Sequence, residues 1–277
     1  MKLTKAIIPV AGYGTRRLPV TKVIEKYMMP LLNRPIVDYT VQECIKAGVT
    51  DIYFVTGKDS VQLQAYYSHN VELEDYLKKR DQPDMLEAIQ PPQGINFHYI
   101  EQDQTNGHYG TTVPVWLCRD VIKDDEPVLI IMGDQCLYRE DGRSDVVDMI
   151  ADTESQNVSA GMIAVPVPDD QVSYYGIIAM DENQHFSHIV DRPSLEEAPS
   201  NLNNASIYLM PGAFWEFVQK DMDRPHDGEY KLTDAINEFV ANGHNIAVHS
   251  AKGTYLDCGN LEGWVEANQY LIQRLKP

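Results

Sequence analysis

The sequence predicts an α/β protein in which a mostly parallel sheet carries helices on both faces. Short apolar runs with strand character, such as residues 5–10 and 127–132, alternate with amphipathic stretches of helical period. Strands that alternate with helices along a chain pair in parallel, because each helix carries the chain back across the sheet. The 277 residues are 43% hydrophobic and 23% charged, which is enough apolar material for a sizeable core.

The first half of the chain carries the regular alternation. Residues 5–10 (KAIIPV) are predicted to form the first strand, although Pro9 is unusual in a central strand. A helix is predicted over 35–47, with Pro35 in its first turn and Gly48 at its C-terminal cap. The other predicted elements are strands at 51–56, 95–100 and 127–132 and helices at 61–67 and 111–119. Residues 81–94 contain three prolines and are predicted to be an excursion or lid.

After Asp134 the pattern loosens and predicts a small β-rich lobe. The predicted elements are helices at 145–153, 232–240 and 260–275 and strands at 158–165, 175–180, 185–190 and 245–250. There is no internal repeat and no long linker. We therefore expect one domain, residues 1–277, with a Rossmann-like, doubly wound half at about 1–134 and a second half at about 135–277.

The formal net charge of −18 argues against binding to nucleic acid or to an anionic membrane surface. Residues 1–34 are different, because they hold seven Lys or Arg and one acid, a charge of +6, against −24 for the remainder. A basic segment on an acidic body predicts a small anionic ligand that is captured locally. A chance cluster of solvated charges is the alternative.

The chain shows no sign of export or of membrane insertion. No window approaches the roughly 18 consecutive apolar residues that a membrane span requires, and MKLTKAIIPVAGYG lacks a signal-peptide cleavage site. A cytoplasmic location is therefore expected. The cysteines have no C-x-x-C spacing, which argues against a zinc ribbon or a dithiol site and predicts buried thiols at Cys44, Cys118, Cys136 and Cys258.

The stretch AGYGTRRLPVTK follows the first predicted strand and has the composition of a phosphate-binding loop. Its glycines can present backbone N–H groups to phosphates. The nearby long cationic side chains are Arg16, Arg17, Lys22 and Lys26. Arg17 replaces the third glycine of G-x-G-x-x-G and no G-K-[ST] follows, which disfavours both NAD-dependent and Walker-type ATPase chemistry. Alternatively, Gly12 and Gly14 only form a tight turn.

The order of motifs resembles the sugar nucleotidyltransferase family, and the bacterial UTP:glucose-1-phosphate uridylyltransferases in particular, over nearly the whole chain. Where that family has G-x-G-T-R-x-L-P, T-K and P-K-E-M-L-P-L, this chain has GYGTRRLP, TK and EKYMMPL. The resemblance implies the nucleotide-diphospho-sugar transferase type of fold. It also implies that Ala11 and Gly12 lie against the base, that Gly14, Thr15 and Arg16 hold the β- and γ-phosphates, and that Lys26 neutralises the α-phosphate.

For the base and the metal, the resemblance points to residues at the ends of predicted strands. Gln102 matches a base-binding glutamine, whose amide suits the imide edge of uracil or thymine. In QTNGHYGTT either Gly107 or Gly110 contacts the base, and we favour Gly107. Asp134 and Asp257 match two metal-binding aspartates, which suit Mg²⁺ as a hard ion that takes oxygen ligands. Without the resemblance, Asp257 could equally be a helix cap.

On the sugar side, the resemblance assigns Gly176 to close approach of the sugar and Asp191 and Arg192 to the place of the family's E-K-P acid and lysine. Asp191 and Arg192 stand where the family has Glu and Lys, and both changes alter the geometry of the sugar pocket. Asp is shorter than Glu, and Arg places its charge differently from Lys. Asn201, Tyr208 and Glu229 also match sugar-binding positions, while Ser206 replaces an expected glycine. Thr233 and Asp234 are as readily explained as helix caps.

The resemblance therefore implies Mg²⁺-dependent transfer of a uridylyl group from UTP to glucose 1-phosphate, which gives UDP-glucose and pyrophosphate by direct in-line attack. A homodimer or homotetramer is expected, with no nucleic acid or membrane partner. Two alternatives stay open. The first is a thymidylyltransferase, or a uridylyltransferase for another sugar 1-phosphate. The second is a catalytically weakened regulatory paralogue, although such a protein has less reason to retain Arg16, Lys26, Asp134 and Asp257.

Overall fold

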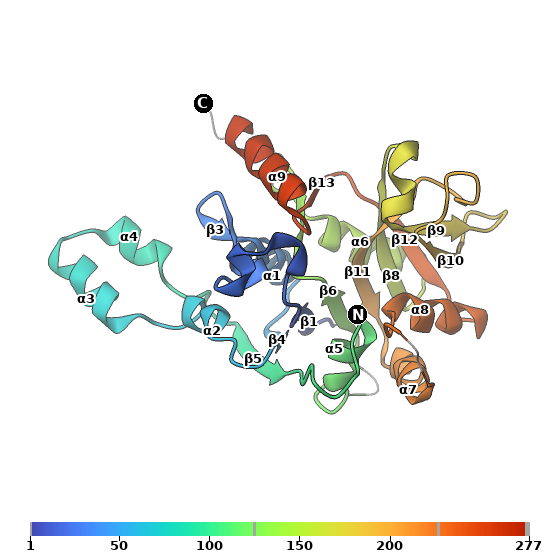
Figure 1. Ribbon diagram of the computed structural model, residues 1–277, viewed down its shortest axis with the longest axis horizontal. Coiled ribbons are helices and arrows are strands. Elements are labelled where there is room, and N and C mark those ends of the chain that lie inside the picture. The colour runs from blue at the N-terminus through green and yellow to red at the C-terminus, as the bar shows by residue number, and fades with distance from the viewer. Residues whose placement is uncertain (1, 124–125, 226–227, 275–277) are drawn as a thin grey trace.

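The computed structural model describes residues 2–274 apart from 124–125 and 226–227 (Figure 1). Within them, a nine-stranded sheet forms the centre of the molecule. Its strands lie in the order β10 (Phe186–Asp191), β9 (Gly176–Met180), β11 (Leu202–Met210), β6 (Val128–Ile131), β1 (Lys5–Val10), β4 (Asp51–Thr56) and β5 (Asn96–Glu101). From β11 the sheet also extends through β8 (Ala160–Pro166) to β12 (Ile246–Ser250).

The central strands β6, β1, β4 and β5 pair in parallel, which confirms the predicted fold class. Pro9 is tolerated because the pairing of β1 with β6 ends at Ile7, so the proline ring does not interrupt that ladder. β11 joins the parallel strands to the β-rich lobe and runs antiparallel to β6. The sequence pattern did not predict β11, because a bulge breaks its register between Asn204 and Tyr208.

Helices cover both faces of the sheet, and the alternation of side chains along a strand explains why. On β1, Ile7 packs in a core with Phe217 and Phe239, whereas Ile8 packs in the opposite core with Val41. The first core lies under α5 (Thr112–Leu117), α7 (Trp215–Asp223) and α8 (Leu232–Ala241). The second lies under α1 (Ile36–Lys46) and α6 (Asp145–Ser155). Each core is continuous from the parallel half into the β-rich lobe.

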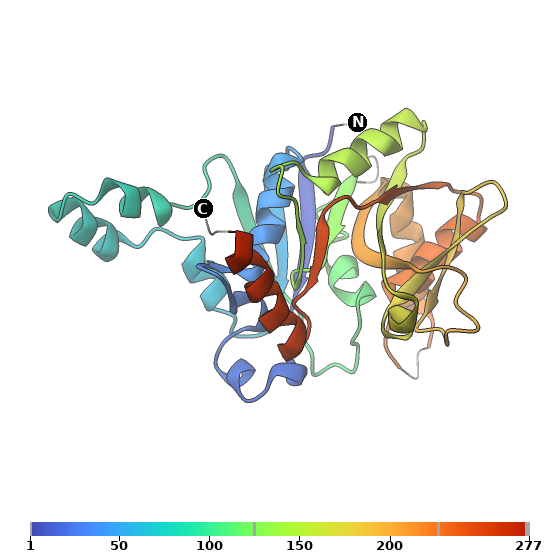
Figure 2. The same cartoon turned by 90° about the horizontal axis from the view of Figure 1, so that it is seen from above.

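A helical arm leaves the sheet between β4 and β5. It contains α2 (Gln62–Tyr66), α3 (Val71–Lys79) and α4 (Pro83–Ala88). In both views α3 and α4 project away from the body of the molecule (Figures 1 and 2). The predicted excursion at 81–94 is the second half of this arm, which contains α4 and the segment that returns to β5.

Two small sheets and the last helix complete the fold. β2 (Pro30–Leu31) pairs with β3 (Arg34–Pro35), and β7 (Gln135–Tyr138) pairs antiparallel with β13 (Thr254–Asp257). α9 (Leu261–Arg274) follows β13, and Leu275 of the predicted helix lies outside the described residues. None of the described helices is long and apolar enough to cross a membrane. All four cysteines are buried free thiols, as predicted, and burial raises the pKa of each.

Candidate active site

A cleft of about 890 Å³ opens where the loops after β1, β5 and β6 meet the β-rich lobe. Ligands of open α/β sheets bind at this carboxyl edge of the parallel strands. All of the residues that the family resemblance assigns to the substrates or the metal line the cleft except Gly107 and Asn201. The arm formed by α2 to α4, which includes the predicted excursion, contributes none of the lining residues, so it does not cover the cleft in this structure.

The glycines of the loop after β1 make room for Lys26. Gly14 has a left-handed backbone with a φ of 67°, and a Cβ there would lie 2.8 Å from the Cβ of Lys26. A Cβ at Gly12 would lie 3.4 Å from the Cε of Lys26. Thr21 closes the turn by donating a hydrogen bond from Oγ1 to the Gly14 carbonyl at 2.8 Å. The loop therefore wraps around the stem of this lysine.

Lys26 forms an ion pair with Asp134 inside the cleft. Its Nζ lies 2.6 Å from Oδ2 of Asp134, and the two side chains are only 20% and 17% exposed. Burial opposes ionisation of Asp134, but the charges of Lys26, Arg17 and Arg16 outweigh it and hold the pKa of this carboxyl below its usual range. A charged lysine is thus held in place next to a charged carboxylate.

The two arginines of the loop have different surroundings. Arg16 is exposed in the cleft and lies close to Gly259, two residues after Asp257. A Cβ added at Gly259 would be 3.7 Å from the Arg16 Nη2. Arg17 is 3% exposed and donates from Nη1 to the Lys26 carbonyl at 2.7 Å. Of the four long cationic side chains singled out in this stretch of the sequence, Arg16 and Lys26 line the cleft, whereas Arg17 and Lys22 do not. Arg17 instead stabilises the short helical turn that carries Lys26.

The predicted metal ligands face the same cleft. The pairing of β7 with β13 places Asp257 opposite Gln135, the residue directly after Asp134. Asp257 Oδ1 accepts a hydrogen bond from the Gly259 N–H at 2.8 Å, and Asp134 Oδ2 is bound to Lys26. Each carboxylate has a second oxygen that can face a ligand. Two carboxylates beside a phosphate-binding loop are a donor set that fits a hard divalent cation.

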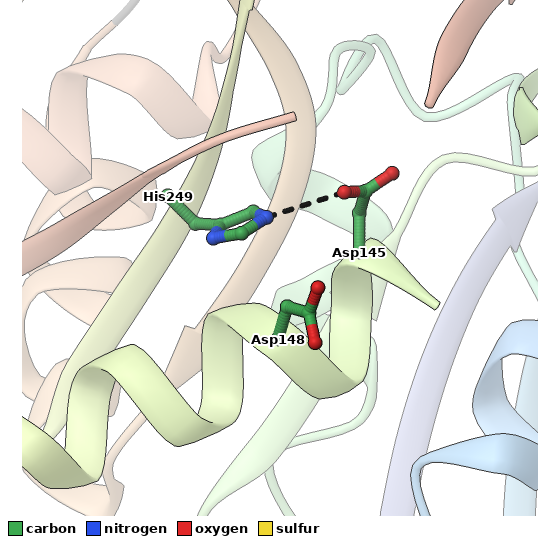
Figure 3. A group of neighbouring side chains, drawn as sticks. All are labelled: Asp145, Asp148 and His249. Atoms are coloured by element: carbon green, nitrogen blue, oxygen red, sulfur yellow. Dashed lines mark hydrogen bonds and ion pairs between the residues drawn. The ribbon is translucent and has the colours of Figure 1, made fainter. Parts of the chain in front are cut away.

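A second acidic group lies outside the cleft, where Asp145, Asp148 and His249 bring ligand atoms within 4.8 Å of one another (Figure 3). Its oxygens are already in use. Asp145 accepts hydrogen bonds from two backbone N–H groups after β12 and from His249 at 3.2 Å, while Asp148 pairs with Arg139 at 2.8 Å. We interpret this group as a structural network that fastens α6 to β12.

This network predicts a pH-dependent stability. The charged groups around the His249 ring are Asp145, Asp148, Asp152, Arg139 and Lys252. Burial lowers the pKa of His249, but its hydrogen bonds to Asp145 and Asp152 outweigh burial and raise the pKa. The stabilisation is therefore complete below the unfolded-state pKa and is lost as pH rises through the folded-state pKa.

We expect His249→Asn to lower the free energy of unfolding by about 1–3 kcal/mol at pH 6 and by clearly less at pH 9. Urea unfolding at the two pH values measures the difference. His69→Asn, which removes an exposed ring from the arm, is the matched control and should change little at either pH. An equal loss for His249→Asn at both pH values would contradict the assignment.

The loop after β5 forms the wall of the cleft on the base side. Gln102 is buried and lines the cleft. Gln104 donates a hydrogen bond from Nε2 to the Ala11 carbonyl. Gly110 forms a bridge with Tyr230, and a Cβ there would lie 2.2 Å from the Tyr230 carbonyl oxygen. The structure therefore places Gly110 in the cleft wall, and Gly107 outside it.

The lobe side of the cleft is built around the ends of β9 and β10. Gly176 pairs in register with Asp191, and Lys231 donates from Nζ to Asp191 Oδ2 at 2.5 Å. Arg192 has a φ of 48° and exposes its side chain into the cleft. Glu229 lies one residue before Tyr230 and also lines the wall.

Several lining residues were missed by the sequence reasoning, and they are Tyr13, Gln104, Tyr109, Gln135, Asn203, Asn204, Lys231 and Tyr255. Lys231 lies two residues after Glu229, and Gln104 lies within QTNGHYGTT, so their positions could have singled them out. Asn203 and Asn204 could not be found this way, because the strand that carries them was not predicted.

The fold and the cleft together define a nucleotide-binding transferase, and the comparisons agree. The family described as "Nucleotidyl transferase" matches residues 5–274. The chain therefore belongs to the nucleotidyl transferase family, which confirms the resemblance seen in its motifs.

The names of individual relatives are more specific than the description of the family. The "UTP--glucose-1-phosphate uridylyltransferase" of Escherichia coli (strain K12) is 34% identical over 278 residues, 96% of this chain and 89% of that protein. A structure described as "UTP-bound UGPase from acinetobacter baumannii" superimposes with a TM-score of 0.88 at 26% identity, over 99% of this chain and 95% of that one. A UDP-glucose pyrophosphorylase complexed with UDP-glucose gives a TM-score of 0.82 at 27% identity, over 99% and 100% of the two chains.

Proposed function

We propose that this protein transfers a uridylyl group from UTP to glucose 1-phosphate, giving UDP-glucose and pyrophosphate. The observation that carries the proposal is the ion pair of Lys26 with Asp134, which lies in one cleft with Asp257, the glycine loop and the β-rich lobe. A triphosphate on the loop and a sugar phosphate on the lobe would meet at this pair. The relatives named above support UTP and glucose 1-phosphate as the two substrates.

In this proposal the two halves of one domain divide the substrates. Residues from about 1–134 bind the nucleotide through Ala11, Gly12, Gly14, Thr15, Gln102 and the Gly107–Gly110 loop. Residues from about 135–277 bind the sugar phosphate through Gly176, Asp191, Arg192, Tyr208 and Glu229, whereas Asn201, which does not line the cleft, stays a prediction. The glycine loop presents backbone N–H groups to the phosphates, and Arg16 adds an exposed positive charge in the cleft.

The reaction needs orientation and charge rather than a covalent intermediate. An oxygen of the sugar phosphate attacks the α-phosphorus of UTP in line, a new P–O bond forms, and the bond to pyrophosphate breaks. Lys26 holds a positive charge at the α-phosphate, and Arg16 stabilises the departing phosphates. Arg192 orients the attacking group, which is a proximity effect.

Asp134 and Asp257 would hold Mg²⁺, which when bound neutralises phosphate charge and polarises the centre under attack. Their carboxylates are suited to this because the described residues leave each with an oxygen outside its hydrogen bond to the protein. Both substrates are charged metabolites that do not cross membranes unaided, so we place the enzyme in the cytoplasm.

We also propose that the protein is a homodimer or homotetramer. Leu261, Val265 and Ile272 form an exposed apolar stripe along α9, with the spacing that places side chains on one face of a helix. A second copy of the chain could cover it. Size-exclusion chromatography with light scattering measures the assembly directly.

A pyrophosphate-release screen tests the proposed function. UTP, dTTP, ATP and GTP would be combined with several sugar 1-phosphates in the presence of Mg²⁺, and the fastest release is expected for UTP with glucose 1-phosphate. A preference for dTTP or for another sugar would overturn the substrate assignment while leaving the reaction class intact. Absence of pyrophosphate release from every pair would contradict both.

A further inference from the structure

Glu25, the residue directly before Lys26, is bound to the root of the helical arm by its backbone and by its side chain. Its backbone N–H donates to Oε1 of Gln62, the first residue of α2, at 3.0 Å. In return, the Glu25 carboxylate accepts from the Gln62 N–H at 3.1 Å and from Oγ of Ser60 at 2.7 Å. The arm therefore occupies both carboxylate oxygens, and Glu25 does not line the cleft.

A fourth hydrogen bond extends this contact along the loop that carries Lys26. Nε2 of Gln62 donates to the Val23 carbonyl at 2.6 Å, so one glutamine side chain holds both ends of the segment 23–25. We call the four bonds among Val23, Glu25, Ser60 and Gln62 the Glu25–Gln62 clamp. Bonds that share their partners restrict a backbone more than the same bonds would in isolation.

The clamp fixes the backbone from which Lys26 projects. Glu25 is the N-terminal cap of the short helical turn Lys26–Met28. On the other side, Nη1 of Arg17 donates to the Lys26 carbonyl at 2.7 Å. The backbone of Lys26 is thus held by the arm before the residue and by Arg17 after it, while its side chain reaches Asp134.

The chain departs from the family motif at this point, and the departure indicates why a clamp is needed. Where the family has P-K-E-M-L-P-L this chain has EKYMMPL, so Glu25 takes the place of a proline. A proline ring fixes φ at about −65°, and Glu25 has a similar φ of −57° without a ring. A proline also lacks the N–H that Gln62 binds. In this chain, hydrogen bonds to the arm supply the restraint that the ring would otherwise provide.

We propose that the Glu25–Gln62 clamp positions Lys26 for the transfer reaction, with Gln62 as a positioning residue that acts through the lysine. The inference rests on the proposed function, which places the ammonium of Lys26 at the α-phosphate. It gives the arm a role in the reaction, although the arm contributes no residue to the cleft lining. A group displaced by about 1 Å can cost on the order of 10²-fold in rate, so a modest loosening of this backbone is enough to slow the chemical step.

The first test compares Gln62→Ala with the wild type, on whichever substrate pair the pyrophosphate-release screen finds active. The kcat should fall about 10-fold while both KM values stay within about twofold, because the clamp touches neither substrate. Gln64→Ala, at an exposed position of the same helix, is the matched control and should leave kcat unchanged. An unchanged kcat in Gln62→Ala would overturn the proposal and leave the proposed function standing.

Variants of Glu25 separate positioning from charge. Glu25→Gln keeps the hydrogen bonds, because its amide oxygen can accept from the Gln62 N–H and its NH₂ can donate to Ser60, so kcat should stay within about twofold of the wild type. Glu25→Ala removes the side-chain bonds and should lose about as much as Gln62→Ala. Equal losses in Glu25→Gln and Glu25→Ala would mean that the carboxylate acts through its charge, which contradicts a clamp.

A double-mutant cycle tests whether the clamp acts through Lys26. In single-turnover measurements, Gln62→Ala should slow the wild type about 10-fold but add little to Lys26→Ala, because a lysine that is absent cannot be displaced. A merely structural role would lower both rates by the same factor, and that result would refute the proposal. A Lys26→Ala rate close to that of the wild type would instead contradict the role of Lys26 in the proposed function, and the clamp proposal with it.

Discussion

Lys26→Ala is expected to reduce the rate of pyrophosphate release by about 10³-fold or more, because the reaction builds negative charge at the α-phosphate and this residue places a positive charge there. The lysine does not act as a diffuse surface charge. Its ammonium is held 2.6 Å from Asp134, and its stem lies against both Gly12 and Gly14. A water molecule or a neighbouring cation would not reproduce that position.

Single-turnover pyrophosphate release with saturating UTP and glucose 1-phosphate measures this effect. Lys26→Arg is an informative second variant, because it keeps the charge but needs more room than the glycines leave, so only partial recovery is expected. Lys46→Ala removes an exposed lysine that pairs with Glu43 and serves as the control. Near-normal turnover of Lys26→Ala with intact folding would refute its catalytic role.

Asp134→Asn is expected to have a comparable effect, about 10³-fold on the same rate, for a different reason. The asparagine preserves the shape of the side chain but removes the charge that holds Lys26 and that would bind Mg²⁺. The variant should therefore remain folded while losing both affinity for the metal and the position of the lysine.

Titration of Mg²⁺ into the protein with UTP present distinguishes loss of the metal from loss of the position of Lys26. If Asp134 is a metal ligand, Asp134→Asn will need a much higher Mg²⁺ concentration for half-maximal rate, whereas Lys26→Ala will not. Asp120→Asn, at an exposed carboxylate paired with Arg119, is the control. An unchanged Mg²⁺ dependence in Asp134→Asn would remove Asp134 from the metal site.

The sequence predicted an element correctly where its apolar pattern agreed with the residues that typically begin or end such an element. The helix with Pro35 at its start and Gly48 after its end was found as α1, and the run KAIIPV was found as β1. β11 was missed because its bulge at Ser206 breaks the alternation, although this strand joins the two halves of the sheet. β7 and β13 were missed because each buries only one of its four residues and so carries no apolar run, unlike β6, which buries all four.

For the site, the sequence by itself determined the chemical groups and their order along the chain: a glycine-rich loop, a basic cluster and two separated aspartates. Only the tertiary structure decided which of them meet. It brought Lys26 to Asp134, which lies 108 residues away, buried Arg17 while leaving Arg16 in the cleft, and placed Gly110 in the wall. The physical reason is that local patterns report burial and turns, whereas contacts between distant segments follow from strand register and from the packing of both cores.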